Sequence, residues 1–249
     1  MFTYDFGYGW YLVYGHLVPL AVFGGLALVA LRRGWRWWLT ALFGIVSLWA
    51  LAAFVIVQAL NRPVTPPSER FLARGTGRIL DVGAGSGRLA IGVLQARPRA
   101  TATALDIYSG YFGIEDNTPE RLMANARAGR VADRLDWTVG DMRQMPFADR
   151  EFDAVVSAYA MDHVGDDGAV AAVREAARVI KPQGDFLLLL VNVDGWVRFV
   201  SLLPHHGLAH HPAANAERWR TLLEQEGFEV LEQGHQPATL WFLGRRRES

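Results

Sequence analysis

Two long stretches without a charged side chain constrain the fold of this chain more than any other feature of its sequence. The stretches Trp10–Leu31 and Leu39–Leu60 are each 22 residues long and contain no Asp, Glu, Lys or Arg. A helix of that length reaches about 33 Å, which matches the hydrocarbon thickness of a bilayer. We therefore expect a membrane hairpin of two transmembrane helices in residues 1–60, with a pair of buried core helices as the alternative interpretation.

The charge of the chain is balanced. It has 25 Lys and Arg residues against 25 Asp and Glu residues, which gives a formal net charge of zero. This balance argues against nucleic acid as a partner, because binding to phosphates requires a basic excess. The absence of cysteine excludes disulfides, thiolate metal ligands and a cysteine nucleophile.

Behind the second apolar stretch the composition changes to that of a globular domain. Segment 61–77 contains three prolines and is predicted to be a linker, with a domain at 78–249. The predicted strands are 78–82, 102–107, 135–139, 152–158, 185–193, 228–233 and 238–244, and the predicted helices are 87–97, 118–129, 168–180 and 214–226. This alternation predicts a doubly wound, Rossmann-like α/β fold with a mostly parallel sheet of seven strands. The short link 234–237 makes the last two strands an antiparallel hairpin.

The stretch RILDVGAGSGRLAI, residues 78–91, joins a predicted strand to a helix through a glycine-rich turn. Glycines let the backbone approach a ligand closely, and in an open α/β sheet such a turn lies in the ligand crevice. A dinucleotide motif G-x-G-x-x-G would need its third glycine at Arg88. The observed G-x-G-x-G spacing, with Asp81 before the first glycine, instead suits a ligand with a cationic amino-acid group.

Two further acidic residues lie at the end of the second predicted strand and just after the third. Asp106 comes 25 residues after Asp81, and a carboxylate at that place accepts hydrogen bonds from ribose hydroxyls. Asp141 follows the third strand and can accept from an adenine amino group, while Met142 packs on the ring. Three carboxylates at three successive strand ends therefore match three parts of one ligand.

With these motifs the chain resembles the class I S-adenosylmethionine-dependent methyltransferases, from about Ile79 to Leu243. The resemblance lies in the stretches LDVGAGSG, ALDI, VGDMRQMPFADREFDAVVSA and VIKPQGDFLLL. The third stretch is most similar to the small-molecule branch, which includes quinone-biosynthesis enzymes. Segment 106–134 also resembles bacterial members that carry an N-terminal membrane hairpin.

This resemblance implies S-adenosylmethionine as the cofactor. The residues that it assigns to cofactor binding are Asp81, Gly83, Gly85, Asp106, Ile107, Asp141 and Met142. The loop between Asp106 and Thr118 is longer than the common pattern of the family.

Three candidate catalytic residues, Tyr159, Asp162 and His163, follow the fourth predicted strand, where the methyl group should emerge. In transfer from a sulfonium the leaving group is already activated, so the protein mainly holds the acceptor in line and excludes water. His163 is the candidate general base, because an unperturbed imidazole titrates near neutrality. A purely structural His163 is the alternative.

Four of the seven histidines, His205, His206, His210 and His211, lie in the connection between the fifth strand and the last helix. Three interpretations stay open for this cluster. It forms a substrate lid, it binds a metal, or it is a solvated loop without a role. No metal site is assigned.

The sequence thus predicts a membrane-anchored methyltransferase that acts on a lipid-like or small hydrophobic acceptor. A cofactor-binding membrane module that tethers or regulates a partner is the alternative, and a nicotinamide-dependent oxidoreductase is a third. Because S-adenosylmethionine is made in the cytosol, we expect the catalytic domain to be cytoplasmic. Residues 32–38, RRGWRWW, then face the opposite side, and their tryptophans are typical of a membrane interface.

Overall fold

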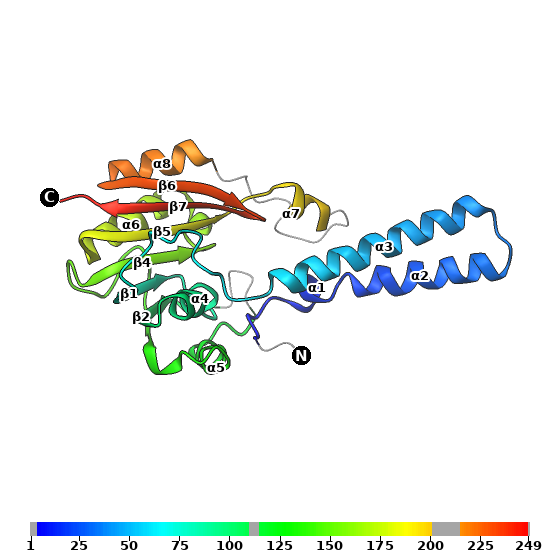
Figure 1. The fold of residues 1–249 in the computed structure, drawn as a ribbon, viewed down its shortest axis with the longest axis horizontal. Helices are drawn as coiled ribbons and strands as arrows, with labels where there is room; N and C mark the ends of the chain where they lie inside the picture. The colour runs from blue at the N-terminus through cyan, green and yellow to red at the C-terminus, as the bar shows by residue number, and fades with distance from the viewer. Residues whose placement is uncertain (1–3, 110–114, 201–214, 249) are drawn as a thin grey trace. The chain divides into compact units, whose positions relative to one another are not determined.

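The computed structural model describes residues 4–109, 115–200 and 215–248, which fall into two compact units (Figure 1). The sheet unit combines residues 4–7 with the described parts of 63–194 and 215–248. The helical unit comprises residues 8–62 and 195–200.

The sheet unit contains seven strands in the order β3-β2-β1-β4-β5-β7-β6. Their bounds are β1 Thr76–Val82, β2 Arg99–Asp106, β3 Leu135–Val139, β4 Phe152–Ala158, β5 Ile180–Val191, β6 Phe228–Gln236 and β7 Thr239–Arg246. The pairs from β3 to β5 are parallel, and β7 runs antiparallel to both β5 and β6. The predicted doubly wound, mostly parallel sheet with one antiparallel strand is confirmed.

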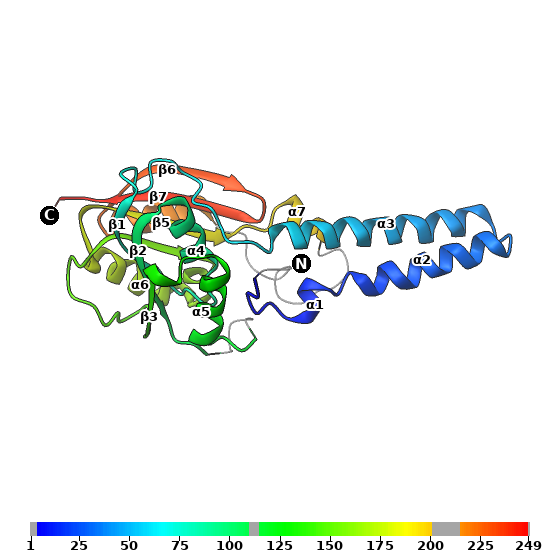
Figure 2. The ribbon, with the colours of Figure 1, turned by 60° about the horizontal axis from the view of Figure 1, so that its bottom comes forward.

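Four helices accompany the sheet: α4 Arg88–Ala96, α5 Pro119–Ala128, α6 Gly165–Val179 and α8 Ala216–Gln225. Local capping explains where two of them begin. The side chain of Thr118 accepts a hydrogen bond from Arg121 N at 3.3 Å, and that of Asn215 accepts from Arg218 N at 3.1 Å. Apolar side chains of α6 and α8 share one buried core with the sheet. Figure 2 shows α4 and α5 on the nearer side of the sheet and α6 on the far side.

Much of the expected linker 61–77 is built into the sheet unit. Val64 N donates to Arg88 O at 3.0 Å, and the Arg97 guanidinium donates to Phe71 O at 2.7 and 2.9 Å. Phe71 is fully buried. Gly92 permits this packing, because a Cβ there would lie 2.0 Å from Val64 O. The segment behind Pro63 therefore rests on α4.

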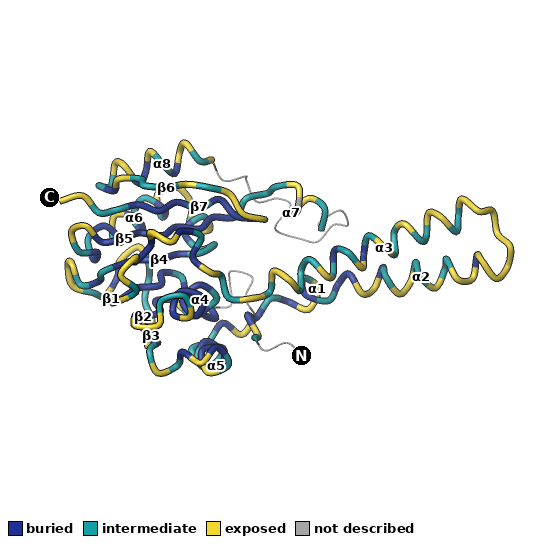
Figure 3. The backbone as a smooth tube through the Cα atoms, viewed as in Figure 1, coloured by how far each residue is buried: buried dark blue, intermediate teal, exposed yellow. Residues whose placement is uncertain are grey.

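The helical unit contains α1 Trp10–Val13, α2 Leu17–Arg32, α3 Trp37–Leu60 and α7 Gly195–Val200. Helices α2 and α3 pack against each other as an antiparallel hairpin (Figure 1). Figure 3 shows exposed residues recurring along both helices, whereas β4 and β5 are mostly buried. Of the described helices, only α3 is long and apolar enough to cross a membrane.

The prediction of two full-length spans is therefore wrong for the first span. The expected helix Trp10–Leu31 is interrupted at residues 14–16, which leaves α2 with 16 residues. Pro19 explains the interruption, because a proline ring clashes with the carbonyl four residues earlier, here that of Gly15. A proline is accommodated in the first turn of a helix, and Pro19 lies in the first turn of α2.

The hairpin carries polar contacts among its apolar side chains. Trp49 Nε1 donates to Phe199 O at 2.9 Å, and His16 Nε2 lies 2.8 Å from Val200 O. Gln58 Nε2 donates to Val13 O at 2.7 Å. Buried polar groups require such partners, so these contacts fix α1 and α7 on the hairpin.

Candidate active site

A pocket of about 330 Å³ lies at the carboxyl ends of the parallel strands, within the sheet unit. It is lined by Gly83, Leu105, Asp106, Ile107, Ser109, Asn117, Gly140, Asp141, Met142, Arg143, Tyr159, Ala160, His163 and Val164. Five of the seven predicted cofactor residues are in this set, and Asp81 and Gly85 are not. Two of the three candidate catalytic residues, Tyr159 and His163, line the same pocket.

The glycine loop, residues 83–87, meets the pocket at Gly83. Its three glycines all have positive φ, at 70°, 52° and 87° for Gly83, Gly85 and Gly87. Gly83 also leaves no room for a side chain, since a Cβ there would lie 2.3 Å from Ala160 Cβ. The N–H groups of Gly83 and Ala84 donate to Leu105 O at 2.8 and 3.1 Å. This side of the loop is therefore fixed to the end of β2.

Asp81 lies beneath the loop and is 1% exposed. Its Oδ2 accepts a hydrogen bond from Ala90 N, in the first turn of α4, at 2.9 Å. Burial raises the pKa of Asp81 to about 7, the nearby charge of Asp106 adds to the rise, and the Ala90 hydrogen bond opposes it. Its Oδ1 has no hydrogen-bond partner among the described residues. The carboxylate thus orients α4, and a cofactor contact from Oδ1 stays a prediction.

Asp106 is held by donors from three segments. Its Oδ2 accepts from Gly85 N at 2.8 Å, and its Oδ1 accepts from Tyr108 N at 2.8 Å and from Asn117 Nδ2 at 3.1 Å. A carboxylate has about four acceptor positions, so one remains for a ribose hydroxyl. Gly85 therefore acts through Asp106, although it does not line the pocket.

Asn117 is a pocket residue that the sequence analysis missed. It is 8% exposed, and its Oδ1 has no hydrogen-bond partner among the described residues. A buried acceptor without a partner is unfavourable, and a hydroxyl of a ligand in the pocket would satisfy it. In the sequence Asn117 is a single Asn in a long loop, and no spacing rule connects it to Asp106.

Asp141 lies at the rim of the pocket and is bound by Arg143. Arg143 Nη2 donates to its Oδ2 at 2.6 Å, and Arg143 Nε lies 3.0 Å from both oxygens. These hydrogen bonds hold the pKa of Asp141 below its usual value. An adenine amino group would therefore share Asp141 with Arg143. Met142 lies deeper, with its Cε 3.1 Å from the position of a Cβ on Gly83.

The candidate catalytic residues have three different surroundings. Tyr159 has a φ of 55°, and its hydroxyl lies 2.6 Å from Thr239 Oγ1. Asp162 is buried away from the pocket, where its Oδ2 accepts from Val191 N at 2.9 Å. Its Oδ1 lies 4.0 Å from His163 Nε2, and the His163 side chain is 33% exposed. At that distance Asp162 Oδ1 forms no hydrogen bond with His163, and of these two residues only His163 lines the pocket.

The histidine cluster at 205, 206, 210 and 211 lies outside the described residues. Within the described ranges, no group of three or more His, Asp and Glu side chains could hold a metal ion.

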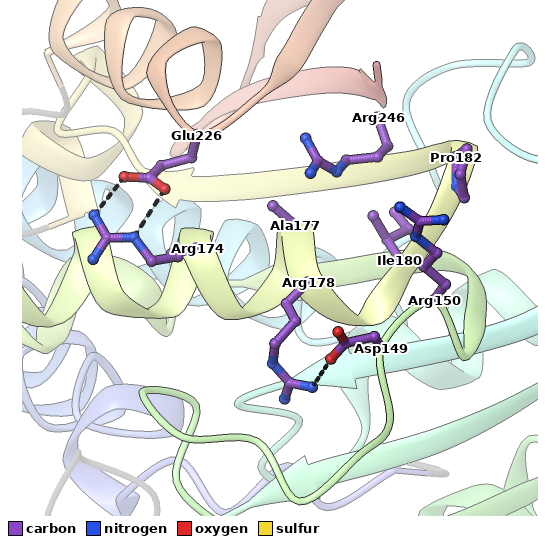
Figure 4. Close-up of a pocket in the computed structure, with 9 residues that line it drawn as sticks. All are labelled: Asp149, Arg150, Arg174, Ala177, Arg178, Ile180, Pro182, Glu226 and Arg246. Atoms are coloured by element: carbon purple, nitrogen blue, oxygen red, sulfur yellow. Dashed lines mark hydrogen bonds and ion pairs between the residues drawn. The ribbon is translucent and has the colours of Figure 1, made fainter. Parts of the chain in front are cut away.

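A second hollow of about 370 Å³ lies where β5 begins (Figure 4). Four of its charged side chains form two ion pairs: Arg174 binds Glu226 at 2.9 Å, and Arg178 binds Asp149 at 2.8 Å. No predicted site residue lines it. The predicted residues that line a pocket are therefore gathered at the carboxyl ends of the strands.

Comparison with known proteins relates this chain to methyltransferases. Residues 79–184 match the model of a family described as a methyltransferase domain. The chain is 34% identical over 112 residues to the ubiquinone/menaquinone biosynthesis C-methyltransferase UbiE of Cereibacter sphaeroides, covering 45% of this chain and 41% of that protein. It is 33% identical over 157 residues to the UbiE of Methylobacterium nodulans, covering 59% and 57%. The chain thus spans about half the length of these relatives.

Solved structures of more distant sequence share the fold. The [4+2]-cyclase SpnF is 19% identical, with a TM-score of 0.56 over 73% of this chain and 79% of that one. An O-methyltransferase family protein from Burkholderia thailandensis is 14% identical, with a TM-score of 0.56 over 84% and 60%. Residues 79–184 are thus similar to a methyltransferase domain, and this likeness implies S-adenosylmethionine as the cofactor.

Proposed function

We propose that the protein is a membrane-anchored methyltransferase that moves a methyl group from S-adenosylmethionine to a lipid-like or small hydrophobic acceptor. The observation that carries this proposal is that one pocket joins the cofactor-type residues Asp106 and Met142 to the base candidate His163. A cofactor side and an acceptor side therefore meet within one cavity.

The residues of the pocket fit the cofactor. Gly83 lines the pocket with backbone alone, and Asp106 with Asn117 offers acceptors for the ribose hydroxyls. The volume of about 330 Å³ falls in the range of small-molecule sites. When bound, S-adenosylmethionine supplies an activated methyl group.

The acceptor side would act by proton removal. His163 takes the proton that a carbon or oxygen acceptor must lose when its bond to the methyl carbon forms, and the Asp162 carboxylate lies 4.0 Å from His163 Nε2. The electron pair of the broken sulfur–carbon bond stays on sulfur, which leaves S-adenosylhomocysteine. The relatives are named C-methyltransferases of quinone biosynthesis, and this supports a carbon acceptor on a ring with an apolar tail.

The anchor in this proposal is the hairpin of α2 and α3. Helix α3, with 24 residues, reaches about 36 Å, whereas α2, with 16, reaches about 24 Å. A short span is accommodated by local thinning of the bilayer and by long basic side chains that extend to the headgroups, here Arg32 and Arg33. The exposed Trp37 at the turn, 80% accessible, is typical of an interface.

Chain connectivity supports a hairpin over a single crossing. The chain leaves the sheet unit at Tyr8 and re-enters it at Pro63, so both ends of the hairpin belong to the same side of a bilayer. That side is the cytoplasm, where S-adenosylmethionine is made, and the turn at residues 33–36 is directed away from it.

A transfer assay tests the catalytic part of the proposal. Detergent-solubilised full-length protein is incubated with methyl-labelled S-adenosylmethionine and a total membrane extract. We expect label in the lipid fraction with the wild type and at least about 10²-fold less with His163→Gln. Cofactor binding without any labelled product would instead support a cofactor-binding membrane module. That alternative has one observation in its favour, because the [4+2]-cyclase shows that this fold does not fix the reaction.

Flotation with phospholipid vesicles tests the anchor. The double variant Leu48→Arg and Val55→Arg places charges at positions that are 66% and 56% exposed on α3. We expect it to lose flotation, because each arginine at the centre of a span costs about 2.5–3.5 kcal/mol. The matched control with alanine at both positions should float. Wild-type protein that stays in the aqueous phase contradicts the anchor.

A further inference from the structure

The residues ahead of the first apolar helix are packed into the sheet unit. We call residues 4–7 the amino-terminal strap. Phe6 is 2% exposed, and the Tyr4 ring stacks on it with a centroid distance of 5.5 Å and an interplanar angle of 8°. Gly7 O accepts a hydrogen bond from Glu115 N at 2.7 Å. The strap is thus an ordered part of the unit that contains the pocket.

One amide side chain joins the strap to the glycine loop. Asn125 Oδ1 accepts from Asp5 N at 2.8 Å, and Asn125 Nδ2 donates to Asp5 O at 2.7 Å and to Ser86 O at 3.0 Å. Asn125 is 3% exposed, so these bonds are shielded from water. An amide nitrogen has two donors and both are used, one on the strap and one on the loop.

A second contact joins the same two segments directly. Ser86 Oγ donates to Phe6 O at 2.7 Å, and Ser86 is 3% exposed. The glycine loop is therefore held from two sides. The β2 side uses Leu105 O and the Asp106 carboxylate, and the other side uses the strap and Asn125.

The two-sided attachment matters because glycine imposes little conformational preference. A loop with three glycines at positive φ must be confined by its contacts if its backbone is to stay in one arrangement against a ligand. Gly83 lines the pocket, and Ser86 lies only three residues behind it. Release of the Ser86 end would let the loop leave its cofactor-binding arrangement, and each binding event would then have to order it again.

We propose that Asn125 is a positioning residue for cofactor binding, and that it acts by fixing the amino-terminal strap against the glycine loop. The strap is continuous with the helical unit, which begins at Tyr8. The segment that leads into the hairpin thus also completes the cofactor site.

Isothermal titration with S-adenosylhomocysteine tests this proposal on the detergent-solubilised full chain. Asn125→Ala should raise the dissociation constant about tenfold with an unchanged binding stoichiometry. Ser86→Ala, which removes one hydrogen bond, should raise the dissociation constant about threefold to fivefold. A merely structural role would lower the melting temperature and the stoichiometry but leave the dissociation constant of the folded fraction unchanged.

A control and a double-mutant cycle complete the test. Asp185→Ala removes a buried acceptor of Leu72 N and Arg245, outside the pocket, and should lower stability without changing the dissociation constant. Phe6→Ala should weaken binding, and its combination with Asn125→Ala should weaken it no further, because both release the same strap. Wild-type affinity in Asn125→Ala and Ser86→Ala overturns the proposal, as does full additivity in the cycle. Because the experiment measures cofactor binding, both of these results would overturn the role of Asn125 without testing the proposed acceptor.

Discussion

The carboxylate of Asp106 accepts a hydrogen bond from the backbone N–H of Gly85 at 2.8 Å. This bond links the end of β2 to the glycine loop that follows β1, so the residue expected to hold the ribose also shapes the loop beside it. Binding and loop geometry are therefore coupled at this carboxylate.

Asp106→Asn should weaken binding of S-adenosylhomocysteine by about 10-fold to 100-fold, because a charged acceptor of three hydrogen bonds is replaced by an amide. Isothermal titration measures the change. Asp136→Asn, on the exposed face of β3, makes the same chemical change outside the pocket and should bind like the wild type. Equal affinities for both variants would remove Asp106 from the cofactor site.

His163→Gln should lower methyl transfer by about 10²-fold to 10⁴-fold, the usual contribution of a general base, while cofactor affinity stays within twofold. Transfer is measured with the labelled cofactor and the membrane extract. His235→Gln is the matched control, because His235 lies on β6 outside the pocket and should leave the rate unchanged. Undiminished transfer in His163→Gln assigns the proton removal to another group.

Asp81 should make stability depend on pH in a defined direction. Its pKa is about 7 in the folded chain against an ordinary value of 3.8, so folding favours the protonated form. That stabilisation is complete below pH 4 and is lost as the pH rises through 7. The melting temperature of Asp81→Asn relative to wild type should therefore increase between pH 5 and pH 8. A constant difference across this range, measured by differential scanning fluorimetry, contradicts the shifted pKa.

Gly92→Ala should lower the free energy of unfolding by about 1–3 kcal/mol, because the new Cβ would lie 2.0 Å from Val64 O and force the segment off α4. Gly25→Ala is the control. It is also a glycine within a helix, but a Cβ there meets nothing within 4 Å, so the change should be neutral or slightly stabilising. Chemical denaturation of the two variants compares them, and equal stabilities would show that Val64 moves away without cost.

The parts of the fold that the sequence predicted are those encoded locally. Alternating apolar runs marked the seven strands, and Asp106 and Asp141 stood out because Asp106 ends one strand and Asp141 lies two residues after another. The unpredicted parts depend on contacts between distant positions. Asn125 binds Asp5 across 120 residues, and no periodicity in the sequence relates them.

Two local signals were present but not used. Pro19 lies inside the first apolar stretch, and its ring is the reason that α2 begins at Leu17. Arg143 stands two residues after Asp141, a spacing that let it bind the carboxylate expected to contact adenine. The length and lack of charge of the first apolar stretch outweighed Pro19 in the prediction of one continuous helix. The family pattern outweighed Arg143 in the prediction that Asp141 contacts adenine.

The contact between Phe6 and Ser86 has a consequence for the order of assembly. Asp5 finds its place only after α5 has been made, because Asn125 must be present to hold it. In the interval the ribosome has already produced both apolar helices. The glycine loop therefore gains its second attachment only after both helices of the hairpin have been made.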